Sequence, residues 1–187
     1  RQGEAKGLGH AFLRGEPCVQ EDHFAIMLPD DLYLGTPPAL GELIDLHQKE
    51  GGAVLGLQTV DRAQSRQYGM VAGKHVGDRQ WRLSGMVEKP TPEDTPSLQA
   101  ITGRYLTPRS LFDILRTQER GALGEIQLTD ALRTLAQQGL FHGLIPQAPR
   151  FDTGSAKGLL IAGIAQGLKS KDAEFLKQAI DQLTSTS

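Results

Sequence analysis

The run Phe24-Ala25-Ile26-Met27-Leu28, which ends at Pro29-Asp30-Asp31, decides the fold class of this chain. Five consecutive apolar residues with nothing polar among them are typical of a strand that is buried on both faces. A similar run, Ala53-Val54-Leu55-Gly56-Leu57, follows after residues 40–49, whose apolar side chains recur at helical spacing. A strand, a helix and another strand in this order form a βαβ unit. The sequence therefore predicts an α/β domain with a mixed, mostly parallel sheet.

Between Tyr68 and Tyr105 the sequence changes character, because short alternating stretches replace the continuous apolar runs. Gly77-Asp78 and several prolines interrupt these stretches, which is typical of strands joined by turns. The region is predicted to be β-rich and to be inserted in, or appended to, the α/β sheet. The expected strands cover residues 69–72, 81–87 and 100–106.

The second half of the chain is predicted to be mainly helical. Thr107 and Pro108 suit an N-cap and a first helical position, so a helix is expected over residues 108–116. Glu125 is expected in the first turn of the next helix, where a negative charge favours the helix dipole. The other expected elements are that helix over 125–138, a strand over 140–145, a helix over 155–168 and an amphipathic helix over 172–183.

Composition indicates an ordinary globular protein. The 187 residues, 39% apolar and 22% charged, suffice for one substantial domain with its own core. The net charge of -2 offers no broad electrostatic footprint for nucleic acid or anionic lipid, and no apolar run is long enough for a membrane helix. The single cysteine, Cys18, excludes an internal disulfide and suits a reducing compartment, so we expect a cytoplasmic protein.

Two of the candidate motifs lie in the first third of the chain. Gly7-Leu8-Gly9-His10 would let the backbone approach a flat or anionic ligand closely, although such a pattern is more often only a tight turn. Asp30 and Asp31 follow a buried strand, at the end of a sheet where ligands bind, and either could hold a hydrated Mg²⁺. Either could equally cap the following turn, and the spacing leaves both interpretations open.

Two further motifs carry charge. In Val87-Glu88-Lys89-Pro90 the carboxylate could accept hydrogen bonds from sugar hydroxyls, while the ammonium could meet a phosphate. The alternative is a solvated charge pair at a strand end. In Phe151-Asp152-Thr153-Gly154 the aspartate could be a second carboxylate near the same metal. Alternatively, Asp152 or Ser155 only caps the following helix.

In their order and spacing, seven segments resemble the bacterial UTP–glucose-1-phosphate uridylyltransferases, or UDP-glucose pyrophosphorylases. No single segment carries the resemblance, but together they extend over nearly the whole chain. The segments are Arg1-Gln2 with Lys6 to Ala11, Leu28-Pro29-Asp30, Tyr68-Gly69, Val87 to Pro90, Ile101 to Tyr105, Gly124 to Ala131, and Asp152-Thr153-Gly154 with Lys157-Gly158.

The resemblance implies a Rossmann-like nucleotide-diphospho-sugar transferase fold with a β-rich sugar-binding region and C-terminal helices. Residues 1–187 would form one nucleotidyltransferase domain. Within it, 1–60 belong to the nucleotide-binding sheet, 61–150 to the sugar-binding region, and 151–187 to a return turn and the C-terminal helices. The implied reaction converts UTP and glucose 1-phosphate to UDP-glucose and pyrophosphate with Mg²⁺, in a protein that can form homo-oligomers.

The resemblance also implies a role for individual residues. Gln2 and Gly7 look like contacts to uracil, and Gly69 and Glu88 like contacts to the glucose hydroxyls. Lys89 resembles the residue that holds the sugar phosphate. Asp30 resembles the main Mg²⁺ ligand and Asp152 a second one, so Lys89 and Asp30 are the expected catalytic residues.

The chain departs from the family in two places. Nothing in it matches the glycine-rich, Arg- and Lys-bearing loop that holds the triphosphate in the family, so by itself it is expected to be inactive. The stretch Ser97-Leu98-Gln99-Ala100 lacks the Asn that usually follows the Ser. Two alternatives stay open: a related transferase that uses another nucleotide or sugar phosphate, and a non-catalytic or truncated paralogue.

Overall fold

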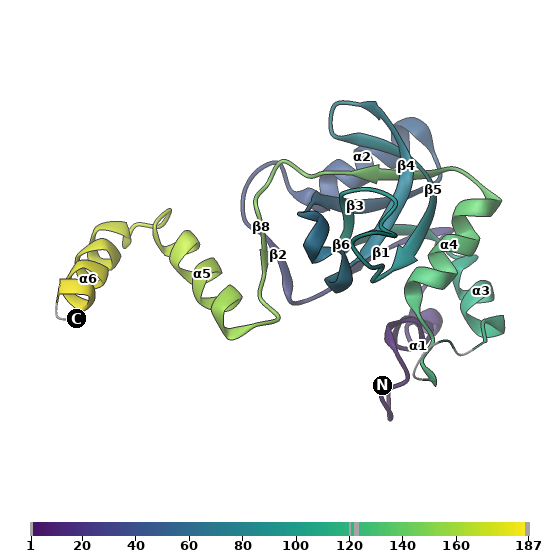
Figure 1. The fold of residues 1–187 in the computed structure, drawn as a ribbon, viewed down its shortest axis with the longest axis horizontal. Coiled ribbons are helices and arrows are strands. Elements are labelled where there is room, and N and C mark those ends of the chain that lie inside the picture. Colours follow the sequence, from purple (N-terminus) through teal and green to yellow (C-terminus); the bar gives the residue numbers. More distant parts are fainter. Residues whose placement is uncertain (1, 120, 122–123, 186–187) are drawn as a thin grey trace.

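The computed structural model describes residues 2–119, 121 and 124–185, which form a sheet covered by helices on both faces (Figure 1). In this part of the chain six strands pair in the order β1-β6-β3-β7-β5-β4, and a separate ribbon pairs β2 with β8. The strands are β1 (His23–Met27), β2 (Asp31–Tyr33), β3 (Ala53–Thr59), β4 (Gly69–Gly77), β5 (Gln80–Glu88), β6 (Gln99–Pro108), β7 (Phe141–Leu144) and β8 (Arg150–Asp152).

The predicted α/β class with a mixed sheet is confirmed, but the expectation of mostly parallel pairing is wrong. Among the described strands only β3 and β7 pair in parallel, and the other pairings are antiparallel. β1 and β3 do run in the same direction, and α2 (Ala39–Glu50) lies between them in the chain as predicted. However, in the sheet β6 lies between them and is antiparallel to both. The order of elements along the chain gives no signal for such an inserted strand. The prediction that the first strand is buried on both faces is wrong, because β1 is an edge strand and none of its residues is fully buried.

The helix expected over residues 108–116 begins later than predicted. Pro108 is the last residue of β6, and α3 covers Leu111–Thr117. Thr107 is fully buried in the strand opposite Phe24 of β1, so it does not cap a helix. Pairing with β1 therefore overrides the preference of proline for a helix start.

The helix expected over residues 125–138 also begins later, since α4 covers Leu128–Gln138. The cause is a backbone contact with the loop near the N-terminus. Ile126 donates to the Lys6 carbonyl at 3.0 Å and accepts from the Gly9 amide at 2.9 Å, which keeps this segment extended. Glu125 consequently lies before the helix and not in its first turn.

Two apolar clusters hold the helices against the sheet. On one face α1 (Leu8–Leu13), α3 and α4 cover a core around Leu55, Phe112 and Leu132. On the other face α2 packs Leu43 and Leu46 against strand residues. Each fully buried leucine contributes about 1.5–3 kcal/mol relative to an exposed one, so both layers are firmly attached. Short 3-10 turns, η1 (Glu16–Cys18) and η2 (Arg62–Gln67), complete this part.

The last two helices, α5 (Ala156–Gly167) and α6 (Ala173–Ser185), extend away from the sheet (Figure 1). Both were predicted from the sequence. Ser155 caps α5, because its hydroxyl accepts from the Gly158 amide at 3.1 Å. Large apolar side chains stay exposed on both helices, for example Leu160 at 63% and Phe175 at 74%. No helix of the described residues has both the length and the apolar character that crossing a membrane requires.

Candidate functional site

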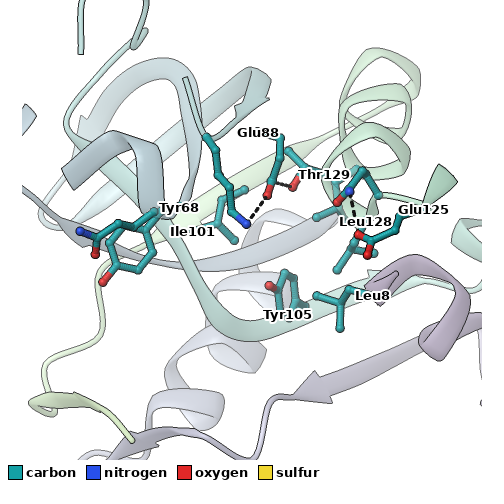
Figure 2. A pocket seen from close by; sticks show the side chains of 13 residues that line it. Leu8, Tyr68, Glu88, Ile101, Tyr105, Glu125, Leu128 and Thr129 are labelled. Atoms are coloured by element: carbon teal, nitrogen blue, oxygen red, sulfur yellow. Dashed lines mark hydrogen bonds and ion pairs between the residues drawn. The ribbon is translucent and has the colours of Figure 1, made fainter. Parts of the chain in front are cut away.

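A cavity of about 290 Å³ opens where the β4–β5 hairpin meets the start of α4 (Figure 2). Gly69 and Glu88 face each other across the hairpin as a register pair, and Lys89 follows directly. In Figure 2 the Glu88 side chain lies between Tyr68 and Thr129. The structure therefore brings together the three residues that the resemblance assigns to the glucose hydroxyls and the sugar phosphate.

Two partners orient the Glu88 carboxylate. Its Oε2 accepts a hydrogen bond from the Thr129 hydroxyl at 2.5 Å, and its Oε1 lies 3.7 Å from Nζ of Lys89. The side chain of Glu88 is 30% exposed and that of Lys89 60%. An ion pair this exposed adds little stability, so the ammonium is available to an incoming anion.

Gly69 leaves room beside this carboxylate. A Cβ atom at Gly69 would lie 3.2 Å from the Thr129 hydroxyl oxygen and 3.3 Å from Glu88 Oε2. A side chain there would press on the hydrogen bond that orients Glu88. Glycine therefore lets the strand backbone itself border the cavity.

The backbone at Lys89 is strained, because its φ is 45° and it precedes a proline. Such a conformation costs about 1–3 kcal/mol and persists only when neighbouring contacts fix it. The Lys89 amide donates to the Tyr68 carbonyl at 3.1 Å. The hydroxyl of Ser65, which is fully buried, donates to the Pro90 carbonyl at 2.9 Å. These contacts hold the turn that presents the ammonium.

A second cavity of about 170 Å³ adjoins the first. Tyr68, Ile101 and Tyr105 line both cavities, so these three side chains form a shared wall. Asp30 and Asp152 line the second cavity alone. The predicted sugar and metal residues therefore lie in neighbouring cavities.

Tyr105 in this shared wall experiences the charges of both cavities. Burial raises the pKa of its phenol, the carboxylates of Asp31, Glu88 and Asp30 raise it further, and Arg150 opposes them. The phenol is therefore neutral, and it forms an uncharged partition between two charged cavities.

Asp30 and Asp152 converge on one point. The Thr153 amide donates to the Asp30 carbonyl at 2.7 Å, and this bond holds the two loops together. A Cβ atom at Gly154 would lie 3.2 Å from an oxygen of each carboxylate. The absence of a side chain at Gly154 therefore keeps open the space between the two carboxylates.

Asp31 does not compete for that space. Its side chain is buried, forms an ion pair with Arg150 and accepts a hydrogen bond from the Gly103 amide. Asp31 therefore has a structural role, whereas the carboxylate of Asp30 forms no hydrogen bond or ion pair with any other described residue.

The carboxylates of Asp30 and Asp152 are suited to bind Mg²⁺. The described residues contain no cluster of three or more His, Cys, Asp or Glu side chains that could hold a metal ion by itself. Mg²⁺, however, is usually held by one or two carboxylates together with waters and substrate phosphates. Asp30 and Asp152 supply that donor set, with Gly154 leaving the space between them.

Gln2 and Gly7 lie next to each other but line neither cavity. The Gln2 amide donates to the Gly7 carbonyl at 3.1 Å and lies 3.0 Å from Nδ1 of His10. Gly7 has a φ of 90°, and a Cβ there would lie 2.7 Å from the Ile126 carbonyl oxygen. Leu8, the next residue, lines the first cavity, so this loop borders the site. Arg1, which the resemblance includes, lies outside the described residues.

The sequence did not identify two residues that orient the charged side chains of the two cavities, Thr129 and Arg150. Thr129 stands inside the Gly124 to Ala131 segment, but only contact with Glu88 gives its hydroxyl a role. Arg150 joins Asp31 to Asp152, whose Oδ2 is 3.5 Å from its guanidinium, and it lies over the ring of Tyr68 at 5.9 Å. Its position directly before the Phe-Asp-Thr-Gly motif was the only signal available.

Comparison with known proteins defines the class. Residues 1–165 match the model of the nucleotidyl transferase family, so the chain belongs to that family. It is 40% identical over 164 residues to the UTP–glucose-1-phosphate uridylyltransferase of Pseudomonas aeruginosa, which covers 87% of this chain and 59% of that protein.

Solved structures agree. A UDP-glucose pyrophosphorylase complexed with UDP-glucose superposes with a TM-score of 0.85 at 35% identity, over 91% of this chain and 65% of that one. The UTP-bound enzyme from Acinetobacter baumannii gives 0.86 at 32%, over 98% and 64%. The resemblance drawn from the seven segments is thus confirmed. The chain spans less than two thirds of each of these three relatives.

Proposed function

We propose that the protein to which this chain belongs transfers uridylyl from UTP to glucose 1-phosphate and releases pyrophosphate. The observation that carries the proposal is the adjacency of two cavities, one with Glu88 and Lys89 and the other with Asp30 and Asp152. One cavity suits a sugar phosphate and the other a metal-bound phosphate. The relatives named above support the choice of UTP and glucose.

In the first cavity, Glu88 and the backbone at Gly69 bind the glucose hydroxyls. A carboxylate held by Thr129 can accept two further hydrogen bonds without rearranging, which favours a fixed sugar orientation. The Lys89 ammonium binds the sugar phosphate as a point charge. Gln2 and Gly7, beside the cavity, bind the uracil.

In the second cavity, Asp30 and Asp152 would hold Mg²⁺. When bound there, the ion neutralises charge that develops on the α-phosphate of the nucleotide. An oxygen of glucose 1-phosphate is already a nucleophile near neutral pH, so no general base is required. The residues of the chain act by bringing two anions together in line and by balancing their charge.

The protein as a whole is proposed to be a cytoplasmic homo-oligomer that contacts neither nucleic acid nor membrane. Exposed apolar side chains on α5 and α6, such as Leu160 and Phe175, suit a contact between copies. This chain on its own is proposed to bind ligands of the sugar cavity and to be inactive in turnover, because nothing in its sequence matches the loop that holds the triphosphate in the family.

The test is a comparison of triphosphates in the full-length protein. Pyrophosphate release is measured with UTP, dTTP, CTP or ATP, each with glucose 1-phosphate and Mg²⁺. The proposal expects UTP to give the highest kcat/KM. Turnover with another nucleotide but not with UTP would support the related transferase, and no turnover with any would support a non-catalytic paralogue.

A further inference from the structure

A polar cavity of about 380 Å³ lies away from the proposed site, at the tip of the β4–β5 hairpin and the end of α2. His142 of β7 and Arg82 of β5 line it. His142 pairs in register with Val54, whose side chain packs on α2. The cavity is therefore on the α2 face of the sheet, whereas the sugar cavity lies on the α4 side.

His142 is buried without a full set of partners. His142 is 3% exposed, and its Nε2 has no hydrogen-bond partner among the described residues. Burial lowers the pKa of the ring, and the nearby Arg82 lowers it further. A buried polar atom left without a partner is destabilising, and native proteins contain few of them.

Arg82 forms no ion pair with any of the described residues. It lies directly opposite His142 on one side and opposite Lys74 on the other, so three basic side chains stand in a row on one face. Like charges in opposed positions destabilise a sheet. Two carboxylates line the cavity, and each pairs with another cation: Glu50 with Lys49 at 3.2 Å and Asp78 with Arg79 at 3.6 Å.

We propose that this cavity binds a small phosphate-bearing anion, at a site distinct from the substrate site. The planar guanidinium of Arg82 matches two oxygens of a phosphate, and Lys49 at the rim adds a point charge. A turn of the His142 ring about χ2 would let it donate to a further oxygen. The anion would supply a negative charge beside the Arg82 guanidinium.

Sulfate is the probe for this proposal, because it stays a dianion throughout the range in which imidazole titrates. The chain is titrated with sulfate while the imidazole signals are followed by NMR. His142→Gln identifies the His142 signal. Saturable binding that shifts this signal is the expected result.

Two variants locate the site. Arg82→Gln should weaken sulfate binding about tenfold or more, since it removes a charge-assisted pair. Lys171→Gln is the matched control, because Lys171 is exposed between α5 and α6, and it should bind within about twofold of the unchanged protein. Circular dichroism confirms that Arg82→Gln, at a half-buried position, is folded.

Binding should also strengthen as the pH falls, because an anion favours the protonated ring of His142. The groups that act on this ring are Arg82 from β5 and Glu50 and His47 from α2. Of these groups Glu50 favours the charged ring, whereas burial, Arg82 and His47 oppose it, and the anion has to overcome that opposition.

Three outcomes would overturn the proposal: no shift of the His142 signal, equal weakening by Arg82→Gln and Lys171→Gln, or binding that Lys89→Ala abolishes. The last would place sulfate in the sugar cavity. Failure of the triphosphate assay leaves this proposal standing, because sulfate binding is measured without substrates.

Discussion

Two carboxylate–cation pairs in neighbouring cavities are held in opposite ways. Asp31 and Arg150 are 4% and 15% exposed, and the backbone amide of Gly103 also donates to the Asp31 carboxylate. Glu88 and Lys89 are 30% and 60% exposed, and Lys89 stands on a strained backbone. The first pair is buried and bonded within the protein, so it stabilises the cavity wall. The second pair, Glu88 and Lys89, remains able to bind a ligand, at a cost in local stability.

Arg150→Ala should have the largest effect on stability. It leaves Asp31 charged and buried without its partner, which costs about 3–5 kcal/mol in the free energy of unfolding. The measurement is urea unfolding followed by circular dichroism. Arg133→Ala, in an exposed pair with Asp130 at 3.0 Å, is the control and should cost less than about 1 kcal/mol.

A double variant, Asp31→Asn with Arg150→Met, sharpens this prediction. Because it removes both charges together, its loss should be smaller than the sum of the two single losses. Strict additivity would mean that the buried pair is not coupled, and the contrast with Glu88 and Lys89 would fail.

Lys89→Gly should lower activity while it raises stability. In the full-length protein, the proposed loss of the phosphate contact lowers kcat/KM about 100-fold or more. At the same time glycine relieves the strain at φ 45°, so the free energy of unfolding should rise by about 1 kcal/mol. Steady-state kinetics and urea unfolding measure the two effects.

Asp30→Ala provides the counterpart in the second cavity. It should reduce turnover as severely as the Lys89 variant but leave stability nearly unchanged, since the Asp30 carboxylate, unlike that of Asp31, forms no ion pair within the part of the chain that the structure describes. Unchanged turnover in both variants would remove the proposed roles of Lys89 and Asp30.

The sequence predicted the charged motifs but not how their members divide the work. Asp30 and Asp31 are indistinguishable by spacing, and only the ion pair with Arg150, distant along the chain, separates them. The meeting of Asp30 with Asp152 depends on the β2–β8 ribbon, which has no periodic signal because each strand has three residues.

Local rules failed where a distant segment supplied backbone bonds. Pro108 favours a helix start, yet pairing with β1 keeps it in β6. Glu125 suits a first helical turn, yet the bonds of Ile126 to the Lys6 and Gly9 backbone hold that segment extended. The same displacement places Thr129 in the first turn of α4, facing Glu88, which no propensity argument could foresee.

Thr129→Val should have the smallest effect of this series. Valine preserves the shape but removes the hydroxyl that fixes Glu88 Oε2 at 2.5 Å. Because the carboxylate still reaches the sugar but is no longer held, KM for glucose 1-phosphate should rise about tenfold with kcat nearly unchanged. Thr134→Val, which removes a hydroxyl bonded to the backbone of the same helix, should leave both constants unchanged. A fall in kcat with KM constant would instead mean that Thr129 helps to set the geometry of the reaction. The exposed pair of Glu88 and Lys89 would then be held in place by Thr129 as well as by the ligand.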